Sequence, residues 1–99
     1  MTTLSGITVA DLQPGDRLTM LSPFTPGGEQ SSTFVQRCQH PIWTSLQLVI
    51  WRMDDGTWLH DALDARQGLP GTIDRAYDDA ERTARLRAAV LGPPVKDDR

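Results

Sequence analysis

The sequence has a single cysteine, a single lysine and no long apolar segment. Because a disulfide needs two cysteines, the lone Cys38 excludes an internal disulfide. No run approaches the roughly 18 consecutive apolar residues that a membrane-spanning helix needs. The first residues, MTTLSGITV, have neither the basic start nor the apolar stretch of a signal peptide. We therefore expect a cytoplasmic protein that does not engage a membrane.

Positive charge is also scarce. Ten Lys and Arg residues face thirteen Asp and Glu residues, which gives a formal net charge of -3. A protein built mainly to bind nucleic acid neutralises phosphates with an excess of basic residues, so the charge disfavours that class. The 99 residues suffice for one domain with one modest core. Nine of the ten basic residues are arginine, and this usage resembles that of proteins from GC-rich genomes, such as those of actinobacteria and their phages.

The most informative part of the sequence is a stretch that contains all three tryptophans. Ser45–Met53 is rich in β-branched and aromatic side chains and is apolar on both alternating faces, which predicts a central strand covered on both sides. Period alone also allows a helix here. The strand is favoured because the run is short and ends at Asp55-Gly56, which supplies the positive φ angles of a tight hairpin. Thr57–Leu63 is then the returning strand, with Trp58 beside Trp51 across the hairpin.

Further strands are predicted on both sides of this hairpin. They are, in chain order, Ile7–Leu12, Arg17–Phe24, Thr33–Gln39 and Thr72–Asp74; the first also fits an extended lead-in and the last fits the start of a helix. Between two of them, Ser22–Ser32 has two prolines, two glycines and three serines, which predicts a loop. Strands that follow one another with short connections favour an antiparallel meander or a small barrel.

A helix is predicted at Asp74–Leu91. Acidic residues are concentrated in its first half and arginines in its second half, as the helix dipole favours, and Gly92 followed by two prolines ends it. Its apolar stripe is mostly alanine, so we expect close, shallow packing against the sheet or against a second copy, which would form a homodimer. Residues 93–99 are predicted to be a disordered tail.

Residues Asp11–Asp16, with the pattern D-L-x-P-G-D before a strand, resemble the start of Tudor- and KOW-like domains, where a Gly-Asp turn feeds the first long strand. The resemblance implies a small antiparallel barrel of four or five strands, of the Src-homology type, over residues 1–74, with a C-terminal helix at 75–92. It also implies binding contacts in the loop between the first two strands, and aromatic side chains that hold methylated Lys or Arg or stack on bases. The expected fold class is therefore mainly β with a C-terminal helix. The alternative is an α+β roll, with the helix packed across an open sheet.

Few residues suggest chemistry. Cys38, His40 and His60 are the only cysteine and histidines, and with Asp61 they are ligand types that zinc accepts. No C-x-x-C spacing occurs, so exposed or hydrogen-bonded histidines are the favoured interpretation and a metal site is the weaker alternative. Nothing around Cys38 resembles a protease signature, and the acidic residues lack the EF-hand spacing. We therefore expect no cofactor and no enzyme activity.

These exclusions favour a protein-interaction module: a non-enzymatic accessory protein of an actinobacterium or its phage that binds a host protein. The side chains expected to contact the partner are aromatic or basic: Phe24, Arg37, Trp43, Trp51, Arg52, Trp58, Arg82 and Arg85. Two alternatives remain open. One is a small nucleic-acid-binding barrel that uses arginines, Arg17 among them, together with the tryptophans. The other is a metal-binding protein built on the cysteine and the two histidines named above.

Overall fold

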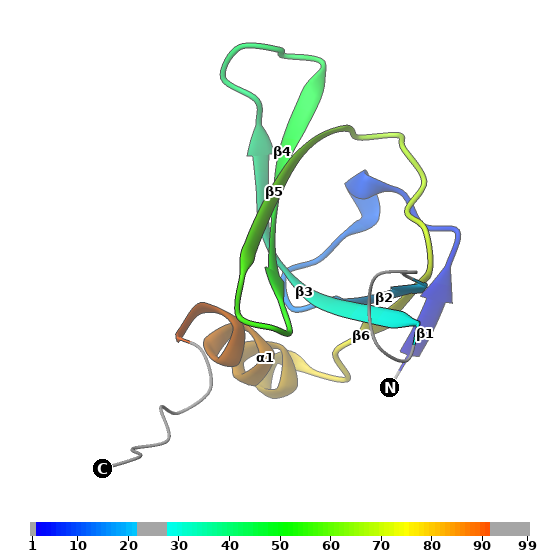
Figure 1. Cartoon of the computed structure of the whole chain (residues 1–99), viewed down its shortest axis with the longest axis vertical. Coiled ribbons are helices and arrows are strands. Elements are labelled where there is room, and N and C mark those ends of the chain that lie inside the picture. The colour runs from blue at the N-terminus through cyan, green and yellow to red at the C-terminus, as the bar shows by residue number, and fades with distance from the viewer. Residues whose placement is uncertain (1, 22–27, 92–99) are drawn as a thin grey trace.

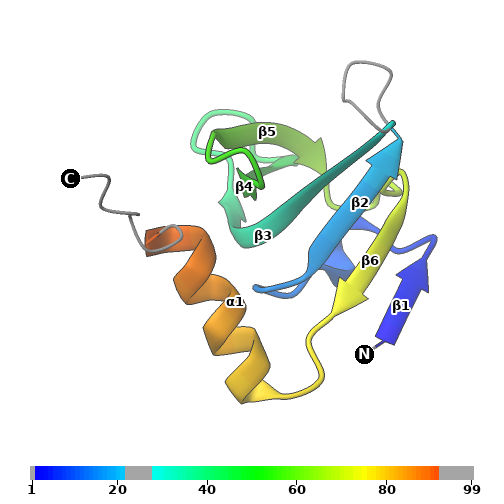
Figure 2. The same cartoon turned by 60° about the horizontal axis from the view of Figure 1, so that its bottom comes forward.

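The computed structural model describes residues 2–21 and 28–91, which form one antiparallel sheet and a C-terminal helix (Figures 1 and 2). The strands are β1 (Thr2–Ser5), β2 (Arg17–Leu21), β3 (Glu29–Gln39), β4 (Leu46–Met53), β5 (Trp58–Asp64) and β6 (Thr72–Arg75). One turn of 3-10 helix, η1 (Val9–Asp11), precedes β2, and the helix α1 (Asp79–Leu91) follows β6. The strand order in the sheet is β1-β6-β2-β3-β4-β5.

The fold class is confirmed as mainly β with a C-terminal helix, but the predicted barrel of four or five strands is wrong. The sheet has six strands and does not close, because β1 and β5 are its two edges. After β5 the chain leaves the ladder and contacts η1 and the residues just before it. Ala10 donates its N–H to the Ala65 carbonyl at 2.9 Å, and Leu69 donates to the Ile7 carbonyl at 3.0 Å. The sheet is curled (Figure 1), yet no edge strand pairs with the other.

The central hairpin forms at the expected place, as β4 and β5, but its loop lacks one of the two positive φ angles that were predicted for Asp55 and Gly56. Met53 donates its N–H to the Thr57 carbonyl at 2.8 Å, and Gly56 donates to the Met53 carbonyl at 3.0 Å. Only Gly56 has a positive φ, of 94°, and Asp55 does not. The connection is therefore a three-residue loop that ends in a left-handed glycine, a known hairpin type.

The three-residue loop decides which side chains share a face. Trp51 pairs with Leu59, and Trp58 pairs with Arg52. Trp51 and Trp58 therefore lie on opposite faces of the sheet, and the predicted cross-strand tryptophan pair is wrong. The physical reason is the period of two along a strand, because a shift of one residue in pairing moves every side chain to the other face.

The core lies on the concave face of the curled sheet, which we call the inner face. Its buried members come from β2, β3, β4, β6 and the segment around η1: Val9, Leu12, Leu18, Phe34, Val49, Trp51 and Ile73. Trp51 is 4% exposed, and its ring meets the Phe34 ring edge-on at a centroid distance of 5.4 Å. The other side of the sheet, the outer face, carries Arg17, Thr33 and Arg52 across three adjacent strands. Among the strands α1 contacts β3, and residues near its end approach this outer face.

Several element boundaries differ from the sequence predictions. The expected strand Ile7–Leu12 is instead the 3-10 turn η1, with one isolated bridge between Thr8 and Gly68. The strand β1 was not predicted. The predicted loop ends earlier than expected because β3 already begins at Glu29, while residues 22–27 lie outside the described part of the chain. The helix begins at Asp79 rather than Asp74, since residues 72–75 form β6. The predicted tail, 93–99, also lies outside the described residues.

Candidate functional site

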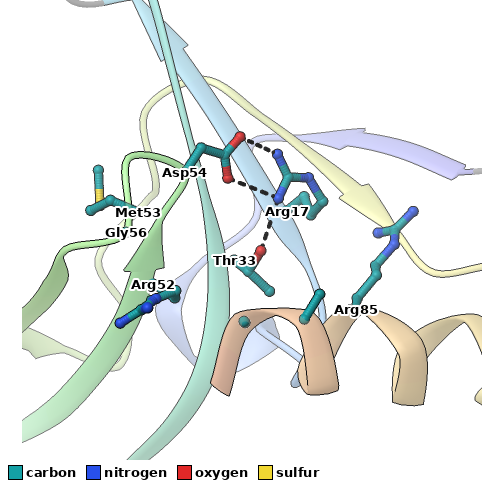
Figure 3. A pocket seen from close by; sticks show the side chains of 9 residues that line it. Arg17, Thr33, Arg52, Met53, Asp54, Gly56 and Arg85 are labelled. Carbon is teal, nitrogen blue, oxygen red and sulfur yellow. Dashed lines mark hydrogen bonds and ion pairs between the residues drawn. The ribbon is translucent and has the colours of Figure 1, made fainter. Parts of the chain in front are cut away.

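A cavity of about 310 Å³ lies between α1 and the outer face of the sheet, and we call it the α1 groove. Its lining combines small apolar groups with charged side chains (Figure 3): Arg17, Thr33, Arg52, Met53, Asp54, Gly56, Arg85, Ala88 and Ala89. The volume is at the lower end of the range for sites that bind small ligands, about 300–1,000 Å³. The groove is therefore large enough for one or two side chains of a partner.

The floor of the groove is set by strand register. Arg17 on β2 and Arg52 on β4 both pair with Thr33 on β3, so the two arginines flank a buried threonine on one face. Arg17 donates to the Thr33 hydroxyl at 2.9 Å and to both carboxylate oxygens of Asp54, at 3.0 and 2.6 Å. The hydrogen bond to Asp54 raises the pKa of the Arg17 guanidinium above its ordinary value. Arg17 is thus a fixed part of the wall.

Arg85 reaches the groove from α1 and is also engaged. Its guanidinium donates to the backbone carbonyl of Asp74 at 2.7 Å and to that of Gly15 at 3.4 Å. It also lies 3.4 Å from a carboxylate oxygen of Asp74 and 3.4 Å from one of Glu81. The Arg85 side chain is only 12% exposed, and its contacts hold α1 against the end of β6. Arg85 positions the helix wall and has few donors left for a partner.

Arg52 differs from the other two arginines of the groove. It makes no hydrogen bond or ion pair with any residue of the described ranges 2–21 and 28–91. Its guanidinium carbon lies 4.8 Å from the centroid of the Trp58 ring, a cation–π contact worth about 0.5–1 kcal/mol at an exposed site. Trp58 itself is 45% exposed on the edge strand. The pair therefore presents an unsatisfied cation and a large aromatic surface beside the groove.

The other side chains predicted to contact a partner lie elsewhere. Arg37 donates to the carbonyls of Val9, Ala10 and Leu12, so it holds η1 against the sheet. Arg82 bonds to Asp79 and Gln13, and Trp51 is in the core. Trp43 is exposed in the connection between β3 and β4, which projects at the top of Figure 1, away from α1. Phe24 lies outside the described residues.

The structure therefore brings Arg52, Trp58 and Arg85 to one region and adds groove residues that sequence reasoning did not group with them. Thr33, Met53 and the alanines of α1 have no chemical signature in the sequence. Only the strand register places Thr33 between two arginines. The Arg52–Trp58 pair could have been predicted from one feature, a hairpin loop of three residues, because the loop length determines which residues of the two strands pair.

The residues considered for a metal site do not converge. Cys38 pairs with Leu48, and His60 pairs with Ile50, so the strand β4 lies between them. His40 is in use: its Nδ1 accepts the N–H groups of Ile42 and Trp43, both at 3.1 Å. This geometry leaves only Nε2 of that ring for another contact. Within residues 2–21 and 28–91, no three His, Cys, Asp or Glu side chains are grouped so that they could hold a metal ion.

No protein-family model matches this chain, and comparison with curated proteins and with solved structures finds no match either. The resemblance to Tudor- and KOW-like domains stays a prediction. In the described part of the chain, the one α-helix is too short and too polar to cross a bilayer.

The chemistry of the α1 groove suits binding. Its charged members are arginines, whose guanidinium groups donate hydrogen bonds and have no acceptor atom, and Asp54, whose two carboxylate oxygens both accept hydrogen bonds from Arg17. The Thr33 hydroxyl accepts a hydrogen bond from Arg17 and has no histidine, lysine or free carboxylate beside it among the lining residues. The arrangement offers a small apolar wall of two α1 alanine side chains, Ala88 and Ala89, next to the Arg52 guanidinium.

Proposed function

We propose that this protein is a non-enzymatic protein-interaction module that binds its partner at the α1 groove and the adjoining Arg52–Trp58 pair. The observation that carries the proposal is the stacking of an unpaired guanidinium on a half-exposed tryptophan, at 4.8 Å. Tryptophan and arginine are the residue types that most often dominate the energy of protein interfaces. We also propose that it is an accessory protein of an actinobacterium or its phage. A homodimer formed through α1 would cover the same groove.

The composition of the groove indicates the kind of side chain that would bind. Ala88 and Ala89 form an apolar wall on α1, which suits an aliphatic side chain. Arg52 has its donors free and favours a carboxylate, which it can bind with two parallel hydrogen bonds. We therefore expect the bound segment to carry an acidic residue next to an aliphatic one.

Nucleic-acid binding is less well supported. Besides the net charge of -3, Arg17, Arg37 and Arg75 are occupied by carboxylates or backbone carbonyls. Removing these arginines from their partners to meet phosphates would break contacts that hold the fold. Among the exposed aromatic side chains of the described residues, Trp43, Trp58 and Tyr77, Trp58 has an arginine stacked on its ring, Arg52.

The proposal can be tested with a random peptide library displayed on phage and selected against the immobilised protein, with the Trp58→Ala variant used for counter-selection. Enriched peptides are expected to contain Asp or Glu, and their affinities are measured by fluorescence anisotropy. Arg52→Glu should weaken binding at least about 10-fold, as expected for loss of a central interface residue. The matched control is Arg87→Glu, the same charge change at an exposed helix position, which should alter affinity less than about twofold.

Two results would contradict the proposed function. One is a library that yields no peptide preferring the unaltered protein over Trp58→Ala, with both proteins shown to be folded by thermal melting. The other is an equal loss of affinity for Arg87→Glu and Arg52→Glu, which would reveal a nonspecific response to net charge.

A further inference from the structure

The edge strand β5 has backbone groups that no neighbour uses. In an antiparallel ladder, hydrogen-bonded and non-hydrogen-bonded pairs alternate. The bond from the Met53 N–H to the Thr57 carbonyl shows that Met53 and Thr57 are a hydrogen-bonded pair. Hydrogen-bonded residues recur at every second position, so Leu59 and Asp61 also direct their N–H and C=O groups to β4. The pairs Arg52–Trp58 and Ile50–His60 are then the non-hydrogen-bonded ones. Trp58 and His60 therefore turn their N–H and C=O groups away from the sheet.

The free part of this edge is short and well delimited. Toward the end of β5 the N–H of Ala62 is taken by the Asp61 carboxylate at 3.1 Å. Beyond β5 the carbonyls of Ala65 and Gln67 accept N–H groups from residues near η1. From Trp58 to His60, nothing in the described chain covers the outward side. An unpaired row of this kind is a ready template for another strand.

We propose that the partner binds by strand addition: an extended peptide pairs with β5 at residues 58–60 and directs an acidic side chain over Trp58 to Arg52. This inference rests on the proposed function and specifies its partner class. Main-chain hydrogen bonds to Trp58 and His60 supply affinity, and the Arg52–Trp58 pair supplies side-chain selectivity, the usual division in this mode of recognition.

The spacing of strands fits this arrangement. Neighbouring strands lie about 4.8 Å apart, so a peptide residue opposite Trp58 lies ~10 Å from the Arg52 backbone. The Arg52 guanidinium already extends over the Trp58 ring. A glutamate on the same face of the added strand can cover the remaining distance. Arg17 and Arg85 do not compete for it, because both are engaged with protein groups.

A second copy is a poorer occupant of the edge than an acidic peptide. Symmetric pairing of two β5 strands about His60 would place the two imidazoles opposite each other and Leu59 opposite Asp61. In that register Ala62 of the second copy would lie opposite Trp58, and its one outer-face carboxylate on β5, Asp64, would lie opposite Gly56, beyond the start of the strand. The charge of Arg52 is met only by a segment that carries its own acid on that face.

The test uses peptides from the selection described above. Each backbone N–H of a bound peptide is methylated in turn, and affinity is measured by fluorescence anisotropy. Because alternate residues of an added strand donate to β5, methylation should weaken binding at least about 10-fold at alternate positions and less than about threefold at the others. On the protein, His60→Pro removes the outward N–H, and an edge strand tolerates this loss. His60→Val keeps the N–H and is the matched control.

We expect His60→Pro to weaken binding at least about 10-fold, and His60→Val to change it less than about threefold. If peptide binding requires Arg52 and Trp58 but the effect of methylation does not alternate along the peptide, strand addition is wrong and the proposed function stands. If no peptide binds, both fail together. A dimer seen by light scattering that His60→Pro converts to a monomer would assign the edge to a second copy and overturn the peptide. If His60→Pro does not fold, the alternation pattern decides alone.

Discussion

Asp16 shows how a local motif and a distant residue combine in one buried group. Its carboxylate is 1% exposed, accepts the Gln13 N–H at 2.9 Å and closes the turn predicted from the sequence. The same carboxylate accepts two bonds from Arg75, at 3.0 and 2.8 Å. The pairing raises the pKa of the Arg75 guanidinium above its ordinary value. The motif that resembled a Tudor-like start thus has a structural role in joining the first turn to β6.

Removal of this buried carboxylate should be costly. Asp16→Ala leaves the Arg75 guanidinium without its partner, and breaking a buried ion pair in this way costs about 3 kcal/mol or more. Urea denaturation measures the change in the free energy of unfolding. The comparison variant is Asp79→Ala, which removes a carboxylate that is 94% exposed and paired with Arg82; it should cost less than about 1 kcal/mol. Equal losses for the two variants would show that the buried pair contributes no more than a surface one.

The identity of single residues gave only part of the site. Arg37, Arg52 and Arg85 are chemically the same in the sequence, and all three were predicted to contact a partner. One holds η1, one holds α1 against β6, and only Arg52 keeps free donors. Which arginine meets which acceptor depends on contacts between distant segments, such as Arg37 with Ala10. Sequence patterns of period two or 3.6 carry no information about such pairs.

At the scale of elements, the backbone just before β6 passes closer to its neighbour than it does at any other glycine of the described residues. Gly71 has a φ of 83°, and a Cβ atom placed there would lie 2.1 Å from the Thr19 carbonyl oxygen of β2. Gly6 also has a positive φ, of 69°, but a Cβ atom there would have no neighbour within 4 Å. The two glycines therefore separate the cost of a left-handed backbone from the cost of a steric overlap.

Replacement of each glycine by alanine should give different losses. Gly6→Ala is expected to lower the free energy of unfolding by about 1 kcal/mol, because alanine is disfavoured in a left-handed conformation and meets no steric overlap there. Gly71→Ala should cost at least about 3 kcal/mol, because β6 must also move away from β2. Chemical denaturation of both variants provides the numbers. Similar values would mean that the chain before β6 can move aside without disturbing the ladder.

The elements that sequence patterns located are those with strong local signals. β4 and β5 have dense β-branched and aromatic residues and a turn sequence between them. β1 was missed because TTLS is short and polar, and its pairing with β6 depends on residues at the other end of the sheet region. β3 was expected to start late because its first residues, EQSS, have the composition of a loop. They are strand because β2 pairs with them.

At the scale of the whole molecule, several carboxyl groups have lowered pKa values because each accepts a hydrogen bond from a nearby N–H or hydroxyl group. The Thr8 N–H lowers the pKa of Asp11, the Thr57 hydroxyl lowers that of Asp55, and the Arg66 N–H lowers that of Asp64. The Tyr77 N–H lowers the pKa of Glu81 at the start of α1. Each group binds its proton less readily when folded than when unfolded.

The sign of the pH dependence follows from these shifts. A carboxyl whose folded pKa is depressed adds stability above its unfolded value, about 4, and loses it as the pH falls through the folded pKa. The thermal midpoint should therefore be nearly constant between about pH 7 and 5 and fall steadily below about pH 4. Calorimetry from pH 7 to 2.5 measures it, and Asp55→Asn should reduce the acid-side slope. A midpoint that does not change down to pH 3 would contradict the prediction.

The position of β6 between β1 and β2 has a consequence for biosynthesis. The first strand leaves the ribosome long before the strand beside which it belongs, because residues 72–75 are translated last in the sheet. At roughly 5–20 residues per second, β1 waits for seconds without a partner. Completion of the sheet is thus deferred until residues 72–75 have been synthesised. A ribosome stalled before residue 72 would hold a chain in which β1 and one edge of β2 remain unpaired.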